Sequence, residues 1–479
     1  MDSTAREYLL RAGRLNRGLP TRDSLLVTAD SLRASLTAFE SDTGYWGRCR
    51  RLLATLNEAR RLYTKDPEVW YALADAQFHY AYGPGQNVTD DDIFEAFRKA
   101  IALDPQFTPA YIHAVELAFA LRGPNDGLRA ARDYIALQPG DAEGAGIRAV
   151  AALGESGDRL VQIRGAIDSL SLDALYTMWQ AIRRWPDSAE TAVGLIRSAA
   201  EMSRAAAAKR RGTDDWFGQE ANRRLLLMLQ LAYRGHLDDA YRNLEHEIDA
   251  RARLFSELAL VGGGVPDSIA ASVFSTWAVT GERYAPAMLP WLAAHGDTAS
   301  LSAVLRRNES RATQSANTVE LRDVRYRIAA ARAYLALAGR DTVTALHLLG
   351  QLPDTLCLGC YVDRLTKGRL LAARGQYQDA WTVLNERLWS LLTPIEVLFA
   401  LERARVAERL GDTKSAIAGY SFVASVWANA DASLRGVSGD ARATAVRLST
   451  RRPRSVATGD AAARPPGPAP PSTRAADTR

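Results

Sequence analysis

The chain is poor in cysteine, in lysine and in long apolar runs, and each shortage excludes a kind of protein. Three cysteines in 479 residues are too few for the disulfide framework of a small secreted domain. Five lysines among 60 basic residues show an arginine bias that we attribute to a GC-rich gene and not to a phosphate site. No run of about 18 apolar residues lacks a charge, so the sequence predicts no transmembrane helix.

The start of the chain and its charge distribution exclude two further classes. MDSTAREYLLRAGRLNRG has no apolar core of the kind found in signal peptides, which favours a cytoplasmic location unless the chain is a piece of a longer protein. The net charge is +5, and the six Arg and two Asp of residues 450–479 supply most of it. Because the rest of the chain is nearly neutral, no nucleic-acid partner is expected.

Residues 450–479 are rich in Pro, Ala and Arg and contain few large apolar side chains. Such a segment cannot bury enough apolar surface to offset the entropy lost on ordering. The sequence therefore predicts a disordered C-terminal tail.

What the sequence does contain is a repeat. IALDP at residues 101–105 returns as IALQP at residues 135–139, which is 34 residues later. Proline ends a helix because it lacks an N–H and clashes with the preceding turn. The first unit is read as two helices, and their apolar or small residues at helical spacing are Trp70, Leu73, Ala74, Phe97 and Ala100.

A second pattern recurs downstream: an apolar helix, a glycine turn, and an alanine a few residues later. Gly339, Gly375 and Gly411 are each 36 residues apart. Glycine accepts the left-handed backbone conformation that ends one helix and lets the next run antiparallel. A small alanine lets the two helices approach closely. The alanines of this pattern, including the one after Gly235, are Ala240, Ala345, Ala380 and Ala416.

These residues resemble the tetratricopeptide repeat (TPR) over residues 65–150 and 320–430. The resemblance implies an all-α fold, a right-handed α-solenoid of antiparallel helix pairs. The first unit departs from the family pattern by an insertion at residues 83–92, between its two helices. The positions that match the family pattern are Trp70, Leu73, Ala74, Phe97, Ala100, Pro105, Gly368, Gly375, Ala380, Ala404, Gly411, Ala416 and Tyr420.

Most of residues 1–450 is also similar to the TPR regions fused to bacterial Ser/Thr kinases and winged-helix regulators. No Gly-rich loop, HRD or DFG sequence of a kinase is present in the chain. The expected organisation is N-terminal helix pairs with a partial repeat at the start (1–64), TPR-like repeats (65–150), divergent helical repeats (151–319), TPR-like repeats (320–449) and the disordered tail (450–479).

In the TPR family, the first helices of successive pairs line a concave groove that binds proteins or peptides. Some members grip a C-terminal carboxylate there with Lys, Asn and Arg. The corresponding positions here are Tyr, Asp, Ile and Glu, which does not support such a clamp. The resemblance places these residues on the groove: Tyr71, Asp75, His79, Ile112, Glu116 and Phe119.

Other candidate sites have simpler readings. Cys357 and Cys360 form a CxxC motif that is compatible with inter-repeat packing, a disulfide, or a redox or metal role. The glycines at 262–264 lack the pattern of a phosphate-binding loop and indicate an inter-helix loop. His79 and His113 have no evident catalytic partner in the sequence. Residues 89–92 (TDDD) suggest a helix cap more than a metal site.

The sequence therefore predicts no catalytic residue, no cofactor and no metal site. The favoured hypothesis is a non-catalytic TPR scaffold that binds a protein or peptide in its groove, in bacterial signalling. The alternative is the sensor or regulatory arm of a Ser/Thr kinase or transcriptional regulator, separated from its effector domain. An enzyme hidden in the divergent middle is a third hypothesis.

Overall fold

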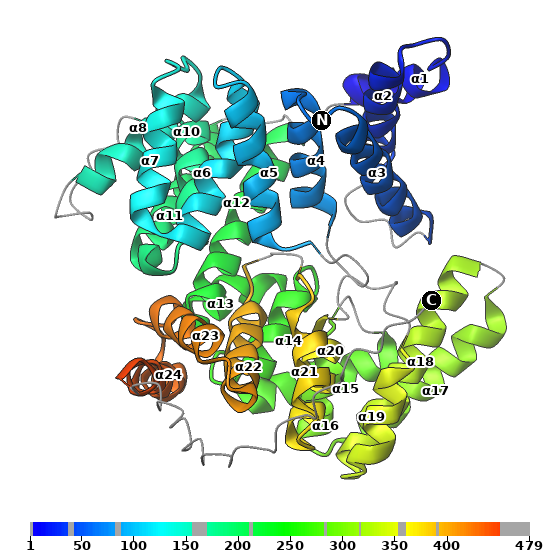
Figure 1. The fold of residues 1–479 in the computed structure, drawn as a ribbon. Helices are drawn as coiled ribbons and strands as arrows, with labels where there is room; N and C mark the ends of the chain where they lie inside the picture. Colours follow the sequence, from blue (N-terminus) through cyan, green and yellow to red (C-terminus); the bar gives the residue numbers. More distant parts are fainter. Residues whose placement is uncertain are drawn as a thin grey trace, which may run out of the picture.

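A computed structural model describes residues 3–36, 43–81, 88–155, 170–209, 214–281, 285–315, 318–352, 361–388 and 392–450. Within these ranges the chain forms α-helices and short 3-10 turns, and no strand (Figure 1). The predicted all-α class is confirmed. Of the predicted disordered tail, only Thr450 belongs to the described ranges, and Cys357 and Cys360 lie outside them.

The N-terminal helices pack as a series of antiparallel neighbours, with close pairs α1–α2, α4–α5 and α6–α7. Side-chain caps account for the starts of two of these helices. Asp66 accepts hydrogen bonds from the first backbone N–H groups of α4, and Thr89 forms a capping box with Asp92 at the start of α5. The helices are α1 (Ser3–Arg14), α2 (Thr21–Ala34), α3 (Thr43–Leu62), α4 (Pro67–Tyr80), α5 (Asp90–Leu103), α6 (Tyr111–Arg122), α7 (Pro124–Ile135) and α8 (Ala142–Glu155).

The middle of the chain continues as helices of less regular length. α14 and α16 pack against each other, and the predicted loop at 262–266 joins α14 to α15. The helices are α10 (Leu172–Ile182), α11 (Ala189–Lys209), α12 (Asp214–Tyr233), α13 (Leu237–Leu244), α14 (Ala252–Val261), α15 (Asp267–Thr280), α16 (Met288–Ala294) and α17 (Thr298–Gln314), with 3-10 turns η1 (Thr108–Ala110), η2 (Pro186–Ser188) and η3 (Glu245–Glu247).

The C-terminal helices again form antiparallel pairs, α18–α19, α20–α21 and α22–α23, followed by α24. The alanines of the glycine pattern are fully buried between paired helices, as predicted. These helices are α18 (Thr318–Ala338), α19 (Thr342–Gly350), α20 (Tyr361–Ala373), α21 (Tyr377–Asn385), α22 (Pro394–Leu410), α23 (Thr413–Val426) and α24 (Ala432–Thr450).

The glycine turns confirm the prediction at two positions and correct it at a third. Gly375 and Gly411 have φ values of 77° and 81°, in the left-handed region. After α18 it is Arg340, and not Gly339, that has a positive φ, of 63°. The connections after α18 and α20 each have three residues, 339–341 and 374–376, and the left-handed residue is the second in both. Gly339 therefore stands one position too early to make the turn. A non-glycine residue in this conformation carries some strain.

The C-terminal helices do not extend the array away from its beginning but fold back against the middle. α22 packs on α12 and α14, and the end of α23 packs on η2. The Trp427 indole donates a hydrogen bond to the carbonyl of Tyr233 over 3.1 Å. Trp427 is fully buried, as is Trp179 of α10. Figure 1 shows the result as two tiers, α4–α11 above and α13–α24 below, with α12 leading from one to the other.

Gly235 makes this docking possible. Its φ is +82°, and a Cβ atom there would lie 2.6 Å from the Cβ of Ala430. Its carbonyl accepts a hydrogen bond from the N–H of Asp431 over 3.0 Å. A side chain at 235 would therefore separate the start of α24 from the end of α12.

In the described ranges, no helix is both long enough and apolar enough to cross a bilayer. This agrees with the expectation from the sequence.

Candidate functional site

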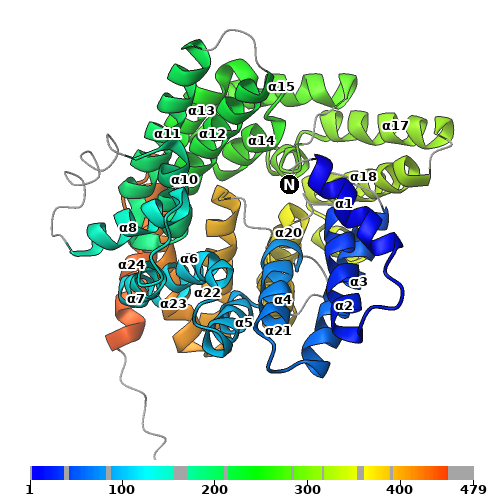
Figure 2. The ribbon, with the colours of Figure 1, turned by 90° about the horizontal axis from the view of Figure 1, so that it is seen from above.

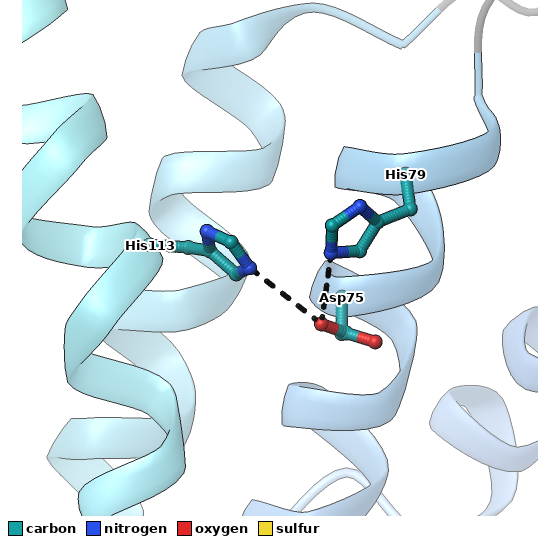
Figure 3. A group of neighbouring side chains, drawn as sticks. All are labelled: Asp75, His79 and His113. Carbon is teal, nitrogen blue, oxygen red and sulfur yellow. Dashed lines mark ion pairs between the residues drawn. The ribbon is translucent and has the colours of Figure 1, made fainter. Parts of the chain in front are cut away.

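Two histidines and an aspartate from α4 and α6 converge at one place between the first helices of two successive pairs (Figure 3). Asp75 and His79 are four residues apart on α4, which puts both side chains on one face of the helix. His113 lies in the first turn of α6. The Nε2 atom of His79 is 3.5 Å from Oδ1 of Asp75, and Nε2 of His113 is 3.9 Å from the same oxygen. The three potential ligand atoms all lie within 4.8 Å of one another.

Aromatic contacts fix the orientation of the His113 ring. Phe78 stacks on it with ring centroids 4.0 Å apart, and Phe97 lies at 5.7 Å. The His113 side chain is 18% exposed, and that of Asp75 is 12% exposed. His79 is 46% exposed, so the cluster opens to solvent on its side.

Behind His113 lies a buried ion pair. Glu116 is 3% exposed and accepts two hydrogen bonds from Arg183, over 3.1 and 2.9 Å. Its second oxygen is 3.8 Å from Nδ1 of His113. Burial alone would raise the pKa of Glu116, but the Arg183 guanidinium and His113 lower it to about 2. Glu116 is therefore a carboxylate at neutral pH.

The backbone that holds Arg183 is fixed by a buried arginine. Arg234, at the end of α12, donates hydrogen bonds to the carbonyls of Trp185 and Pro186 over 2.9 and 2.6 Å. It also donates to the hydroxyl of Ser188 over 2.7 Å. The segment after α10 is thus held by Arg234, and Arg183 reaches Glu116 of α6 from this segment.

The charges around the cluster balance. Arg33 of α2 lies 3.5 Å from Oδ2 of Asp75, opposite the oxygen that faces the histidines. Burial lowers the pKa of His79, against the opposing effect of Asp75, and His113 lowers it further. These effects together lower the pKa of His79 below that of an ordinary imidazole.

The predicted groove residues divide between this cluster and the interior. Asp75 and His79 meet in the cluster and Glu116 supports it. Tyr71 and Ile112 are half-buried, and Tyr71 packs edge-on against Phe107 at 5.3 Å. Phe119 is 1% exposed and packs on Trp185. A partner-binding role for these residues stays a prediction.

The sequence did not predict that His113 joins the cluster. In the repeat pattern His113 follows Ile112, one residue away from the face assigned to the groove. Its approach to Asp75 is a contact between two different helices, α6 and α4, which the repeat pattern does not specify. The useful signal was the pair Asp75 and His79 at i,i+4, two potential ligands on one helix face.

A second candidate site is a cavity of about 620 Å³ between α14 and α16 on one side and α18 and α20 on the other. Leu260, Leu337 and Leu370 supply apolar walls. Arg340 and Arg369 also line it, and no Asp or Glu does. Arg369 donates to Glu402 over 2.9 Å, whereas the exposed Arg340 side chain has no ion pair with any described residue.

Comparison with known proteins adds little to these observations. No family model matches the chain, and no curated protein matches it. Among solved structures, the TPR domain of P58(IPK) aligns over 90% of this chain and 100% of its own, at 12% identity and a TM-score of 0.24. Yeast Tom70 aligns over 90% of this chain and 96% of its own, at 11% identity and a TM-score of 0.25. A human IFIT1 dimer with PPP-AAAA aligns over 94% of this chain and 96% of its own, at 14% identity and a TM-score of 0.25. At such TM-scores these likenesses carry no argument, and the description of the fold rests on the helices themselves.

Proposed function

We propose that the chain is a non-catalytic helical-repeat scaffold that binds an extended, acidic segment of a partner protein. The observation that carries the proposal is the cavity between α14, α16, α18 and α20. Its apolar walls and its two arginines, without a lining carboxylate, match a segment that offers an apolar side chain next to Asp or Glu. α18 and α20 are the first helices of their pairs, the position that faces partners in TPR proteins.

The cavity has the size of a side-chain pocket and not of an extended interface. Its volume of about 620 Å³ accommodates one or two side chains of a peptide that continues across the neighbouring surface. Arg340 gains most from an acidic partner because it has no ion pair among the described residues. Arg369 already pairs with Glu402 and is a weaker candidate.

The test is a peptide-display selection against the full chain. Selected peptides should combine Asp or Glu with a large apolar residue, and their affinity should fall as salt rises. Arg340→Glu should weaken their binding by about tenfold or more, equal to about 1.4 kcal/mol. Arg409→Glu, an exposed charge reversal on α22 outside the cavity, is the matched control. Enrichment of basic peptides, or equal effects of the two variants, would refute the proposal.

The biological setting we propose is bacterial signalling, and this part rests on the sequence resemblance alone. The second candidate from that resemblance is the regulatory arm of a Ser/Thr kinase or winged-helix regulator. Affinity capture from the native cell extract with mass spectrometry separates the two. A retained partner with an endogenous chain of about this mass supports the scaffold, and a kinase or DNA-binding domain joined to the chain supports the regulatory arm.

A further inference from the structure

We propose that Asp75, His79 and His113 bind a divalent transition-metal ion, with Zn²⁺ as the preferred ion. Imidazole nitrogens together with one carboxylate oxygen are a ligand set that suits Zn²⁺, and three protein ligands leave the fourth tetrahedral position for water. This inference goes beyond the peptide-binding proposal and does not depend on it, because the cluster and the cavity use different helices.

The distances are close to those of an occupied site. Tetrahedral ligands at zinc–ligand distances of about 2.0–2.1 Å lie about 3.4 Å from one another. Here Oδ1 of Asp75 is 3.5 Å from His79 Nε2 and 3.9 Å from His113 Nε2, and the three atoms span at most 4.8 Å. Occupation therefore requires a small contraction, and His79 can supply it because it is half-exposed in the last turn of α4.

The surroundings of His113 resemble the support that metal-binding histidines require. Metal-bound imidazoles commonly direct their second ring nitrogen at a carboxylate, which fixes the tautomer. Nδ1 of His113 is buried, makes no hydrogen bond within the described structure, and lies 3.8 Å from Oε2 of Glu116. A proton on Nδ1 facing Glu116 leaves the lone pair of Nε2 directed at Asp75 and His79. Arg183 holds Glu116 in place through two hydrogen bonds.

The competing reading is an ion-pair cluster without a metal. Arg33 and Arg183 neutralise Asp75 and Glu116, so net charge gives a dication no long-range attraction. Two facts favour the metal. Both Nε2 atoms point to one oxygen, and Arg33 occupies the other oxygen of Asp75.

An ion at this position would join α4 to α6 directly. His79 and Asp75 belong to one helix pair and His113 to the next, so the ion would cross-link successive repeats. Its fourth coordination position would face solvent on the side of His79. That position could accept water or a carboxylate or imidazole of a bound segment.

The test is a Zn²⁺ titration of the full chain after removal of metals with a chelator, in competition with a chromophoric zinc indicator. One ion should bind per chain. His79→Ala and His113→Ala should each weaken binding by about 100-fold, and Glu116→Gln by about tenfold. His347→Ala, on the exposed face of α19, is the matched control and should bind like the parent chain.

The Cys357–Cys360 pair is the alternative zinc ligand in this chain and needs its own control. Cys357→Ser with Cys360→Ser should leave the affinity unchanged. Co²⁺ substituted into the parent chain should show the visible absorption of a four- or five-coordinate ion and no thiolate charge-transfer band. If circular dichroism shows that a histidine variant does not fold, the Co²⁺ spectrum of the parent chain still tells whether the cysteines bind the ion.

Three outcomes would overturn the proposal. The first is no stoichiometric Zn²⁺ binding by the parent chain. The second is unchanged affinity in the folded His79→Ala and His113→Ala variants. The third is a thiolate band with Co²⁺, or loss of binding in the double serine variant, either of which assigns the ion to the cysteines.

Discussion

Replacing Arg387 with alanine should loosen the contact between the two tiers of the molecule. Arg387 follows α21, which lies beneath α4 when the molecule is seen from above (Figure 2), and it hydrogen-bonds to α4 and α5, about 300 residues earlier in the sequence. Its Nε donates to Asp90 over 2.8 Å, and its Nη1 donates to the carbonyls of Gln77 and Ala81 over 2.9 and 3.2 Å. A guanidinium thus satisfies the carbonyls at the C-terminal end of α4, where the helix dipole favours a cation, and it pairs with the carboxylate at the start of α5.

The magnitude follows from these contacts. Breaking a buried ion pair so that one charge is left alone costs about 3–5 kcal/mol. Asp90 keeps Arg184 as a second partner at 2.6 Å in the variant, so this cost is reduced. A charge-assisted hydrogen bond contributes about 1.5–3 kcal/mol and each carbonyl bond about 1 kcal/mol. We expect Arg387→Ala to cost about 3 kcal/mol, whereas Asp90→Ala should cost more because it strands Arg184 and Arg387 together.

Hydrogen exchange measures the loss of stability of α4 and α5 directly. A local measurement is needed because a long repeat array need not unfold in two states. Amides in the last turn of α4 and in α5 should exchange about 100-fold faster in Arg387→Ala, as about 3 kcal/mol implies. Arg374→Ala, an exposed arginine after α20, serves as the control. The exchange rates of Arg387→Lys should lie between those of the parent chain and of Arg387→Ala. An ammonium keeps the positive charge but lacks the planar array of N–H donors of a guanidinium. Equal exchange of α4 and α5 in the Arg387→Ala and parent chains would refute the reasoning.

Three further predictions concern single positions. Burial raises the pKa of Asp363 to about 6 despite hydrogen bonds from Tyr326 and Tyr334. As the pH rises from about 4 to about 6, the free energy of unfolding of the parent chain should therefore fall by about 3 kcal/mol. Urea unfolding should show Asp363→Asn gaining on the parent from pH 4 to pH 8, and a pH-independent difference would contradict this. A Cβ at Gly368 would lie 2.5 Å from Leu384, so Gly368→Ala should destabilise by about 1–3 kcal/mol, whereas Gly436→Ala, in open space on α24, should stabilise by about 0.5–1 kcal/mol; the same sign in thermal melts would be inconsistent. Thr89→Ala removes the capping box of α5 and should cost about 1 kcal/mol, which Thr89→Ser should largely restore.

Local chemistry explains why the helices and their ends could be predicted. The helical spacing of Trp70, Leu73 and Ala74 and the cap at Thr89 depend on residues a few positions apart, and the structure has α4 and the capped α5 where they indicate. The turn after α18 shows the limit of such rules. The left-handed residue is the second of the three connecting residues, as after α20, but Arg340 and not Gly339 occupies that place, because the geometry of the connection decides which residue turns.

Contacts between distant helices could not be predicted in the same way. The helix cap predicted at residues 89–92 is confirmed, with Thr89 as N-cap and Asp92 in the capping box, but the sequence did not predict that Asp90 pairs with Arg184 and Arg387. The partners are 94 and 297 residues away, and no repeat position identifies them. The same holds for His113, which meets Asp75 from a different helix. Periodicity fixes the face on which a residue lies but not what lies opposite.

These distant contacts distinguish the molecule from an open solenoid, in which each repeat touches only its neighbours. Arg183 and Arg184 stand side by side after α10, and each pairs with a carboxylate on a different helix, Glu116 of α6 and Asp90 of α5. Asp90 in turn holds Arg387 from the C-terminal tier, and Glu116 supports His113 of the proposed metal site. The closure of the two tiers and the geometry of the cluster therefore share one anchor, the segment that Arg234 fixes after α10. Loss of the Arg387 contact would therefore leave Asp90 held by Arg184, on the same segment whose Arg183 holds Glu116 beside His113.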